Sequence, residues 1–181
     1  NTGVGYNALG LNTTGSDNVA INALVNNTTG IRNVAAGSGA LYTNTTSSNM
    51  VALGYRALYT NGSGHSNVAV GADAMRFNAG GVNNVGVGYN ALQNNTSAGA
   101  LTAVGSGALG ANTTGNYNVG IGNLAGSSIT TGAQNTAIGT TALDALTTAN
   151  NNTACGYDAL GQSTGNDNTG VGYNAMGGVT S

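Results

Sequence analysis

Apolar and polar residues recur along this chain in a fixed order, with a dominant period of about 17 residues, which is the signature of a stacked repeat architecture. The phrase Asn-Thr-Gly-Val-Gly-Tyr-Asn-Ala-Leu opens at Asn1 and returns with small changes at Asn84 and Asn168. We term each repeat a coil and each position within it a column. The eleven coils begin at Asn1, Asn18, Asn33, Met50, Asn67, Asn84, Leu101, Asn118, Asn135, Asn152 and Asn168.

Columns three to nine carry most of the apolar residues, and columns three, four, five, eight and nine each keep one chemical type in most coils. Column three is always Ala or Gly, which predicts that another part of the backbone passes close by. Column four is mostly Val, Ile or Leu, as in Val4 and Val87, which predicts a buried strand position. Column five is Gly in ten of eleven coils, which predicts a corner with positive φ. The exception is the second coil, which is shorter because the Gly-Tyr pair is missing after Ile21.

Column eight is Ala and column nine is Leu or Met in most coils, whereas the last third of the coil is polar, as at residues 12–15 and 112–115. Asn, Thr and Gly are turn-forming residues. A helix does not fit, because Gly recurs too often at about 1 kcal/mol each in a helix interior, and no apolar stripe has helical spacing. One coil is therefore predicted to hold a short strand, a Gly corner, a second short strand and a polar turn.

Identical coils stacked in register predict an all-β fold, a parallel β-solenoid (β-roll) of about eleven 17-residue coils. The residues of columns four and nine are expected to fill its interior. The Asn that opens most coils is expected to stack and hydrogen-bond along the axis. With strands about 4.8 Å apart, the rod is roughly 50 Å long. Residues 1–181 are expected to form a single repeat domain, a fragment of a longer fibre protein, because the pattern is already running at both ends.

A single coil buries few large side chains for the length of chain that it orders. Apolar burial in one coil does not offset the conformational entropy lost when its backbone and side chains become ordered. We therefore predict a homo-oligomer, with a trimer as the first expectation. The lateral contact is expected at the tyrosines of column six: Tyr6, Tyr55, Tyr89, Tyr157 and Tyr173.

Charge is scarce, since 4% of the residues are charged against roughly 25% in an ordinary domain. The net charge is -2, and the three cations, Arg32, Arg56 and Arg76, lie in different coils and are expected to be solvated surface charges. Without a basic patch, neither nucleic acid nor an anionic membrane is an expected partner. No apolar run is long enough to insert into a bilayer. A single cysteine, Cys155, excludes a disulfide within the chain.

The phrase Asn-x-Ala-(Val/Ile)-Gly, followed by a small-residue strand, resembles the head repeats of trimeric autotransporter adhesins. The fuller phrase at residues 135–143, together with Asn-Thr-Thr-Gly, also resembles repeats in phage and marine-bacterial tail-fibre proteins. The resemblance covers the entire chain, although the polar turn is longer here than in adhesin heads. It implies a left-handed parallel β-roll that trimerises. It also implies a structural module of an extracellular, cell-surface or virion fibre that mediates attachment as a rigid rod, with a host-surface receptor or glycan as partner.

The reactive side chains are not arranged as a catalytic, cofactor-binding or metal site, so we expect no enzyme. His65, the only histidine, is expected to be a solvated turn residue, since a triad or metal site needs partners. Cys155 occupies column four and is expected to be a small core hydrophobe. Asp17 and Asp167 are expected to form turns, because the calcium-binding nonapeptide signature is absent. The Gly-x-Gly at residues 86–88 is expected to be a solenoid corner, since no strand–loop–helix context surrounds it.

Two other functions fit a solenoid. Ladders of Thr and Asn on a flat face order water in an ice-binding β-solenoid, and a partial rank is formed here by Thr13, Thr28, Thr45 and Thr113. That rank is expected to be interrupted at Ser63, Gly80 and Ala98. An enzyme with a solenoid groove needs clustered carboxylates. Asp144 and Asp158 are separated by nearly one coil along the chain, but they lie in different columns.

Overall fold

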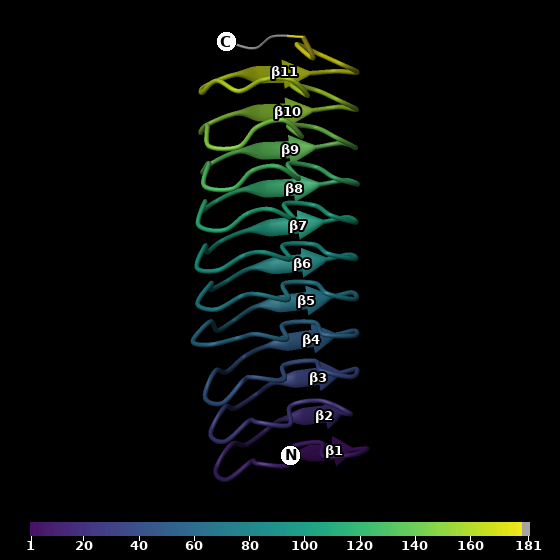
Figure 1. The fold of residues 1–181 in the computed structure, drawn as a ribbon, viewed down its shortest axis with the longest axis vertical. Coiled ribbons are helices and arrows are strands. Elements are labelled where there is room, and N and C mark those ends of the chain that lie inside the picture. The colour runs from purple at the N-terminus through teal and green to yellow at the C-terminus, as the bar shows by residue number, and fades with distance from the viewer. Residues whose placement is uncertain (179–181) are drawn as a thin grey trace.

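The computed structural model, which describes residues 1–178, is one stack of coils that rises along a single axis (Figure 1). Each coil contributes one three-residue strand, and the strands pair in parallel, in sequence order, as an 11-stranded sheet. No helix occurs within residues 1–178. The parallel β-solenoid is therefore confirmed. The strands are β1 (Thr2–Val4), β2 (Val19–Ile21), β3 (Val34–Ala36), β4 (Val51–Leu53), β5 (Val68–Val70), β6 (Val85–Val87), β7 (Thr102–Val104), β8 (Val119–Ile121), β9 (Thr136–Ile138), β10 (Thr153–Cys155) and β11 (Thr169–Val171).

Strand register carries each sequence column directly onto the same column of the next coil. Between β1 and β2, Gly3 pairs with Ala20. Between β2 and β3, Ala20 pairs with Ala35, although the second coil is shorter than the others. The missing pair lies after the strand, so the register is preserved.

The prediction that column four fills the interior is wrong, because column three points inward instead. Ala52 and Ala103 in column three are fully buried, whereas Val4 and Val104 in column four are 56% and 38% exposed. Successive strand side chains point to opposite faces, so only one of these columns can face the core. Cys155 in column four is accordingly exposed rather than in the core.

The inside of the sheet has room only for small residues, which explains column three. A Cβ placed on Gly86 would lie 3.1 Å from Met75 Cε, and one on Gly3 would lie 3.3 Å from the Ala8 carbonyl oxygen. The opposite wall of the coil is therefore close, as the Ala and Gly of this column predict.

The second predicted strand is wrong, since residues 6–11 and their equivalents form turns. Leu58 and Leu92 in column nine have φ of 51° and 52°, outside the range of an extended strand. Their side chains are nonetheless fully buried, so column nine does form part of the core. The turn wall also remains bonded between coils, because Leu58 N donates to the Ala74 carbonyl oxygen at 3.0 Å.

The glycine corner of column five is confirmed. Gly54 and Gly71 have φ of 135° and 133°, a region that L side chains rarely adopt. A Cβ on Gly54 would also lie 2.6 Å from the Gly71 carbonyl oxygen in the next coil. Both the backbone angle and the close stacking of coils therefore require glycine.

Two ladders of buried asparagines run along the axis. In the column-one ladder, Asn84 N donates to Asn67 Oδ1 at 2.9 Å, and Asn84 Nδ2 donates to the Ala98 carbonyl oxygen at 2.9 Å. This confirms the stacking predicted for the first Asn of each coil. In the column-twelve ladder, which was not predicted, Asn61 Nδ2 donates to Asn44 Oδ1 at 3.1 Å. Buried amides are thus satisfied by the same residue type in neighbouring coils.

Candidate functional site

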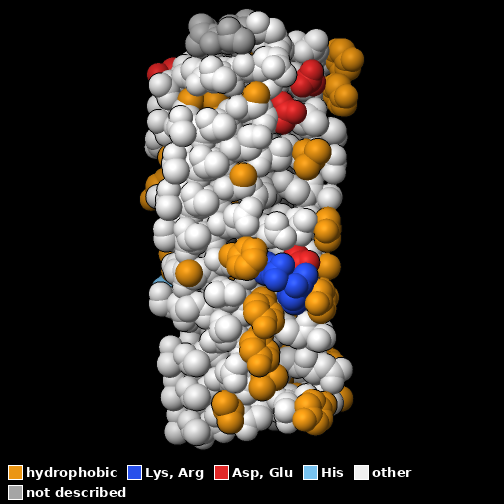
Figure 2. All heavy atoms as spheres, in the orientation of Figure 1, with side chains coloured by type: hydrophobic (Ala, Val, Ile, Leu, Met, Phe, Trp, Pro, Cys, Tyr) orange, Lys and Arg blue, Asp and Glu red, His pale blue; other side chains and the backbone are white. Residues whose placement is uncertain are grey.

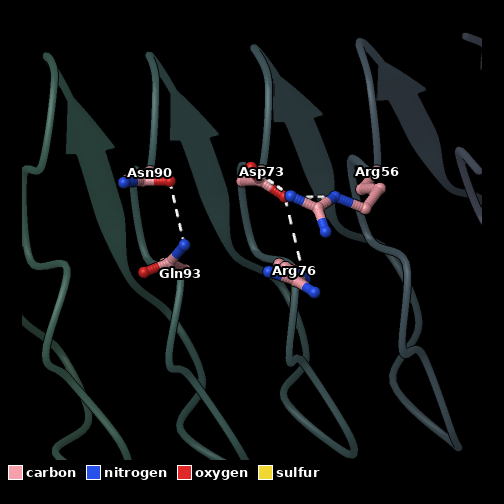
Figure 3. Close-up of polar contacts among 5 residues, drawn as sticks. All are labelled: Arg56, Asp73, Arg76, Asn90 and Gln93. Atoms are coloured by element: carbon pink, nitrogen blue, oxygen red, sulfur yellow. Dashed lines mark hydrogen bonds and ion pairs between the residues drawn. The ribbon is translucent and has the colours of Figure 1, made fainter.

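Most of the positive charge of the chain gathers at one place on the surface. Arg56 and Asp73 both occupy column seven of adjacent coils, and Arg76 occupies column ten beside them (Figure 3). Arg56 Nη2 donates to Asp73 Oδ2 at 3.0 Å, and Arg56 Nε lies 2.9 Å from Asp73 Oδ1. Arg76 Nε lies 3.7 Å from the same Oδ1. The expectation that the arginines are solvated surface charges is therefore wrong for Arg56 and Arg76, which pair with Asp73, whereas Arg32 is exposed.

Each of the two guanidinium groups also lies over an aromatic ring. Arg56 Cζ is 4.5 Å from the ring centre of Tyr55, and Arg76 Cζ is 4.7 Å from that of Phe77. These are favourable cation–π distances. Because two cations share the single carboxylate of Asp73, the cluster keeps an excess positive charge in a chain that is negative overall.

An open depression of about 430 Å³ lies next to this cluster, walled by Arg56, Arg76, Tyr42, Tyr55 and Tyr59. The rings of Tyr42 and Tyr59 are stacked, with centres 5.2 Å apart and planes 4° from parallel. Figure 2 shows the blue arginines on this face of the rod, with hydrophobic side chains in orange around them.

A second depression of about 480 Å³ adjoins the first, since both are lined by Ser38, Gly39 and Tyr42. Its remaining walls are Tyr6, Asn7, Asn22 and Val25. We refer to the two depressions together as the aromatic groove. It extends from Tyr6 in the first coil to Arg76 in the fifth, along the axis of the rod.

The short second coil creates the second depression of this groove. Asn22 N donates to the Val4 carbonyl oxygen at 2.9 Å, the bond that a column-five glycine such as Gly54 makes to the preceding coil elsewhere. In the second coil, the single residue Asn22 thus takes the place of columns five to seven, and this coil has no column-six side chain. The third coil adds only Ser38 and Gly39 at the corner. The missing Gly-Tyr pair was therefore the sequence signal for a hollow, which single-column reasoning did not connect with a site.

The other residues considered from sequence remain apart. His65 is exposed, with Nδ1 3.3 Å from Ser66 Oγ, as predicted for a turn residue. Asp17 and Asp167 are exposed with φ of 59° and 61°, as predicted for turns, and they lie in the first and tenth coils. Across residues 1–178, no group of three or more His, Cys, Asp or Glu lies together.

Asp144 and Asp158 interact although they lie in different columns. Columns ten and seven meet at the same corner, as the Arg76–Asp73 contact shows. Burial raises the pKa of Asp144 above its ordinary value, and the negative charge of Asp158 raises it further. Asp144 Oδ1 is shielded from solvent and has no hydrogen-bond partner among the described residues. The ninth and tenth coils thus carry an acidic pair in the same two columns in which the fourth and fifth coils carry Arg56 and Arg76.

The threonines of the predicted rank do share one column, but the rank is interrupted at other residues than predicted. Thr28 Oγ1 donates to the Thr45 carbonyl oxygen at 3.0 Å, and Thr96 Oγ1 donates to that of Thr113 at 3.0 Å. The backbone bond from Gly62 N to the Ala79 carbonyl oxygen occupies the same column. The interruption therefore falls at Gly62 and Ala79 rather than at the three residues expected. These hydroxyl groups donate their hydrogens to the next coil and not to water. Ice binding stays a prediction, which a measurement of thermal hysteresis tests.

No family model, curated protein or solved structure matches this chain. Within the described residues, no helix is long and apolar enough to cross a membrane. Two surfaces of the rod bear on its function, namely the outward face of the sheet and the aromatic groove.

Proposed function

We propose that the chain is a structural module of an extracellular or virion fibre, a rigid homotrimeric rod that mediates surface attachment without catalysis. The observation that carries this proposal is the outward face of the 11-stranded sheet. Column four is apolar in every coil and points outward, so a strip of apolar side chains follows the length of the rod. Its exposed members include Val4, Ile21, Leu53, Val104, Ile121, Ile138 and Val171.

A contiguous exposed apolar strip of this length is typical of an interaction surface. The strip repeats in every coil, so a parallel second copy of the chain presents matching spacing along its full length. Homo-oligomers close by symmetry, and a three-fold arrangement turns all three sheet faces toward one axis. The tyrosines of column six are less suitable, because that column is interrupted by Ser38, Ala72 and Ser106. We therefore place the trimer contact on the sheet face instead of the tyrosines.

Rigidity follows from how each coil is held by its neighbours. Backbone bonds link successive coils in the sheet, at the turn wall and in the polar turns, and the two asparagine ladders add side-chain bonds. The near absence of Lys and Arg leaves few sites for trypsin-like proteases, which suits exposure outside the cell. The resemblance to adhesin heads and tail-fibre repeats supports the same function.

The test is the mass of the folded particle, measured by light scattering after size exclusion. We expect three times the chain mass of 17.5 kDa. The double variant Val104→Asp/Ile121→Asp should weaken assembly at least about 100-fold, since it buries unpaired charges in the contact. The matched control Ser106→Asp/Asn123→Asp lies in the same two coils but in column six, and it should leave the mass unchanged. A monomeric wild-type chain contradicts the trimer, and a trimeric Val104→Asp/Ile121→Asp variant contradicts the contact surface.

A further inference from the structure

We propose that the aromatic groove binds an acidic oligosaccharide, a chain of hydroxylated rings that carries carboxylate or sulfate groups. The inference rests on the proposed attachment function and gives that function a location, in the first five coils of the rod. The groove is lined by residues of columns six to ten, which follow the glycine corner, and no column-four residue lines it, so we expect trimer assembly through the sheet face to leave it open.

The arginines supply the attraction for an anion. Arg56 faces Asp73 with Nη2 at 3.0 Å and Nε at 2.9 Å, whereas Arg76 approaches Asp73 only to 3.7 Å. The Arg76 side chain is 27% exposed, and within the described part of the chain its guanidinium forms this ion pair but donates no hydrogen bond. A guanidinium with unused donors, fixed in place by Phe77 and Asp73, matches the planar geometry of a carboxylate or sulfate group.

The tyrosines supply platforms for the rings of the ligand. Tyr42 and Tyr59 stack almost in parallel along the rod axis, and Tyr42, Tyr55 and Tyr6 are 39%, 52% and 86% exposed. Aromatic faces bury apolar C–H surface while the phenol hydroxyl stays available at the rim. The amides of Asn7 and Asn22 can donate and accept hydrogen bonds with sugar hydroxyls.

The shape of the groove favours a chain laid along the axis. It is open and shallow, unlike the enclosed apolar pockets that hold small hydrophobic ligands. A peptide gains much of its affinity by adding a strand to a free sheet edge. In the second to fifth coils, however, each strand already pairs on both sides. An acidic saccharide therefore fits the observed groups better than an acidic peptide does.

The experiment titrates the full chain, by calorimetry and tyrosine fluorescence, with oligogalacturonate for carboxylate, a heparin-derived oligosaccharide for sulfate, and a neutral dextran oligosaccharide. We expect at least one acidic probe to bind, with affinity that falls as salt rises, and the neutral probe not to bind. Arg76→Gln should lower the affinity about 10- to 100-fold, whereas the control Arg32→Gln should leave it unchanged.

A second pair of variants tests the groove itself without depending on charge. Ser38→Tyr introduces the residue that column six carries in coils such as that of Tyr55, so it should fold, fill the hollow and abolish binding. Ser106→Tyr makes the same change in a distant coil and should bind as the wild type does. Equal binding of all three probes, no binding of either acidic probe, or full binding by Ser38→Tyr overturns the proposal. The proposal is also overturned if an oligo-aspartate peptide binds more tightly than the acidic saccharides and the Ser38→Tyr variant no longer binds that peptide.

Measuring particle mass on the same samples separates this proposal from the preceding one. A monomer that binds the acidic probe through the groove contradicts only the trimeric rod. A trimer that binds no acidic probe contradicts only the saccharide site.

Discussion

The corner at column twelve is built in two different ways along the rod. In the second to seventh coils it holds a buried asparagine, as at Asn61, whose Nδ2 donates to Asn44 Oδ1 at 3.1 Å and to the Gly64 carbonyl oxygen at 3.0 Å. In the eighth and ninth coils it holds Ile129 and Leu146, both fully buried. The polar turn that follows is bonded alike in both regions. Either filling is acceptable, because a buried amide ladder is stable when every member is satisfied, and an apolar core has nothing to satisfy.

The junction between the two regions shows how a polar ladder ends. Asn112 has Ile129 above it, which cannot donate a hydrogen bond. Its Oδ1 instead accepts a bond from Asn118 Nδ2 at 3.1 Å, and its own Nδ2 donates to the Gly115 carbonyl oxygen at 3.1 Å. The last amide is therefore satisfied by the column-one ladder. The change of corner chemistry after the seventh coil thus leaves no buried amide oxygen of Asn112 unsatisfied.

Breaking the polar ladder should have the largest effect. Asn61→Ala leaves Asn44 Oδ1 and Asn78 Nδ2 without their shared partner inside a dry corner, where each unsatisfied group costs about 1–3 kcal/mol. We expect a loss of about 3 kcal/mol or more in the free energy of unfolding, measured by urea denaturation. Ser63→Ala, an exposed residue of the same turn, is the control and should change stability by less than about 0.5 kcal/mol. Equal losses for the two variants contradict a stabilising role for the ladder.

Extending the polar ladder into the apolar region should have an intermediate effect, read as a coupling energy. In the single variant Ile129→Asn, the new amide oxygen lies beneath Leu146, whose side chain has no hydrogen-bond donor. In the single variant Leu146→Asn, the new amide lies above Ile129, whose side chain has no acceptor. Together they form a stack between Asn112 and Ser163. We therefore expect the double variant to lose about 1 kcal/mol less unfolding free energy than the two single variants lose together, as measured by a double-mutant cycle. Additive losses mean that the stacked amides do not interact.

The sequence was sufficient for the architecture because repetition and turn chemistry specify it. The columns, the stack, the glycine corner at residues such as Gly54 and the column-one ladder were all predicted. The inside and outside of the strand were inverted, because hydrophobicity favours burial of Val104 over Ala103, whereas the narrow interior admits only the smaller side chain. The second strand failed because the positive φ of Leu58 depends on tertiary packing rather than on leucine's own preference.

The site could be predicted only in part. The missing pair after Ile21 was visible, but the hollow appears only when the corners of three coils are stacked. The pairing of Arg56, Asp73 and Arg76 was hidden because columns seven and ten meet only after the coil turns between them (Figure 3). Contacts between different columns depend on the path of the turn, which a column-by-column reading does not provide.

Columns seven and ten also differ in charge between the middle of the rod and its ninth and tenth coils, and this difference gives the smallest expected effect. Asp73 lies between two arginines, whereas Asp144 faces Asp158. Because burial and Asp158 raise the pKa of Asp144 above its ordinary value of 3.8, the folded chain binds more protons there than the unfolded chain does. This contribution to stability is complete below that value and is lost as the pH rises through the raised pKa.

The variant Asp144→Asn should therefore match the wild type in melting temperature near pH 3 and exceed it at pH 7. The gain is limited to about 2–4 °C, the shift that ~1 kcal/mol produces in a domain of this size. Asp17→Asn, an exposed turn residue whose φ asparagine also adopts, is the control and should change little at either pH. If the difference in melting temperature between Asp144→Asn and the wild type is the same at pH 3 and pH 7, the acidic pair is contradicted. Only a group that titrates between these two pH values makes that difference depend on pH.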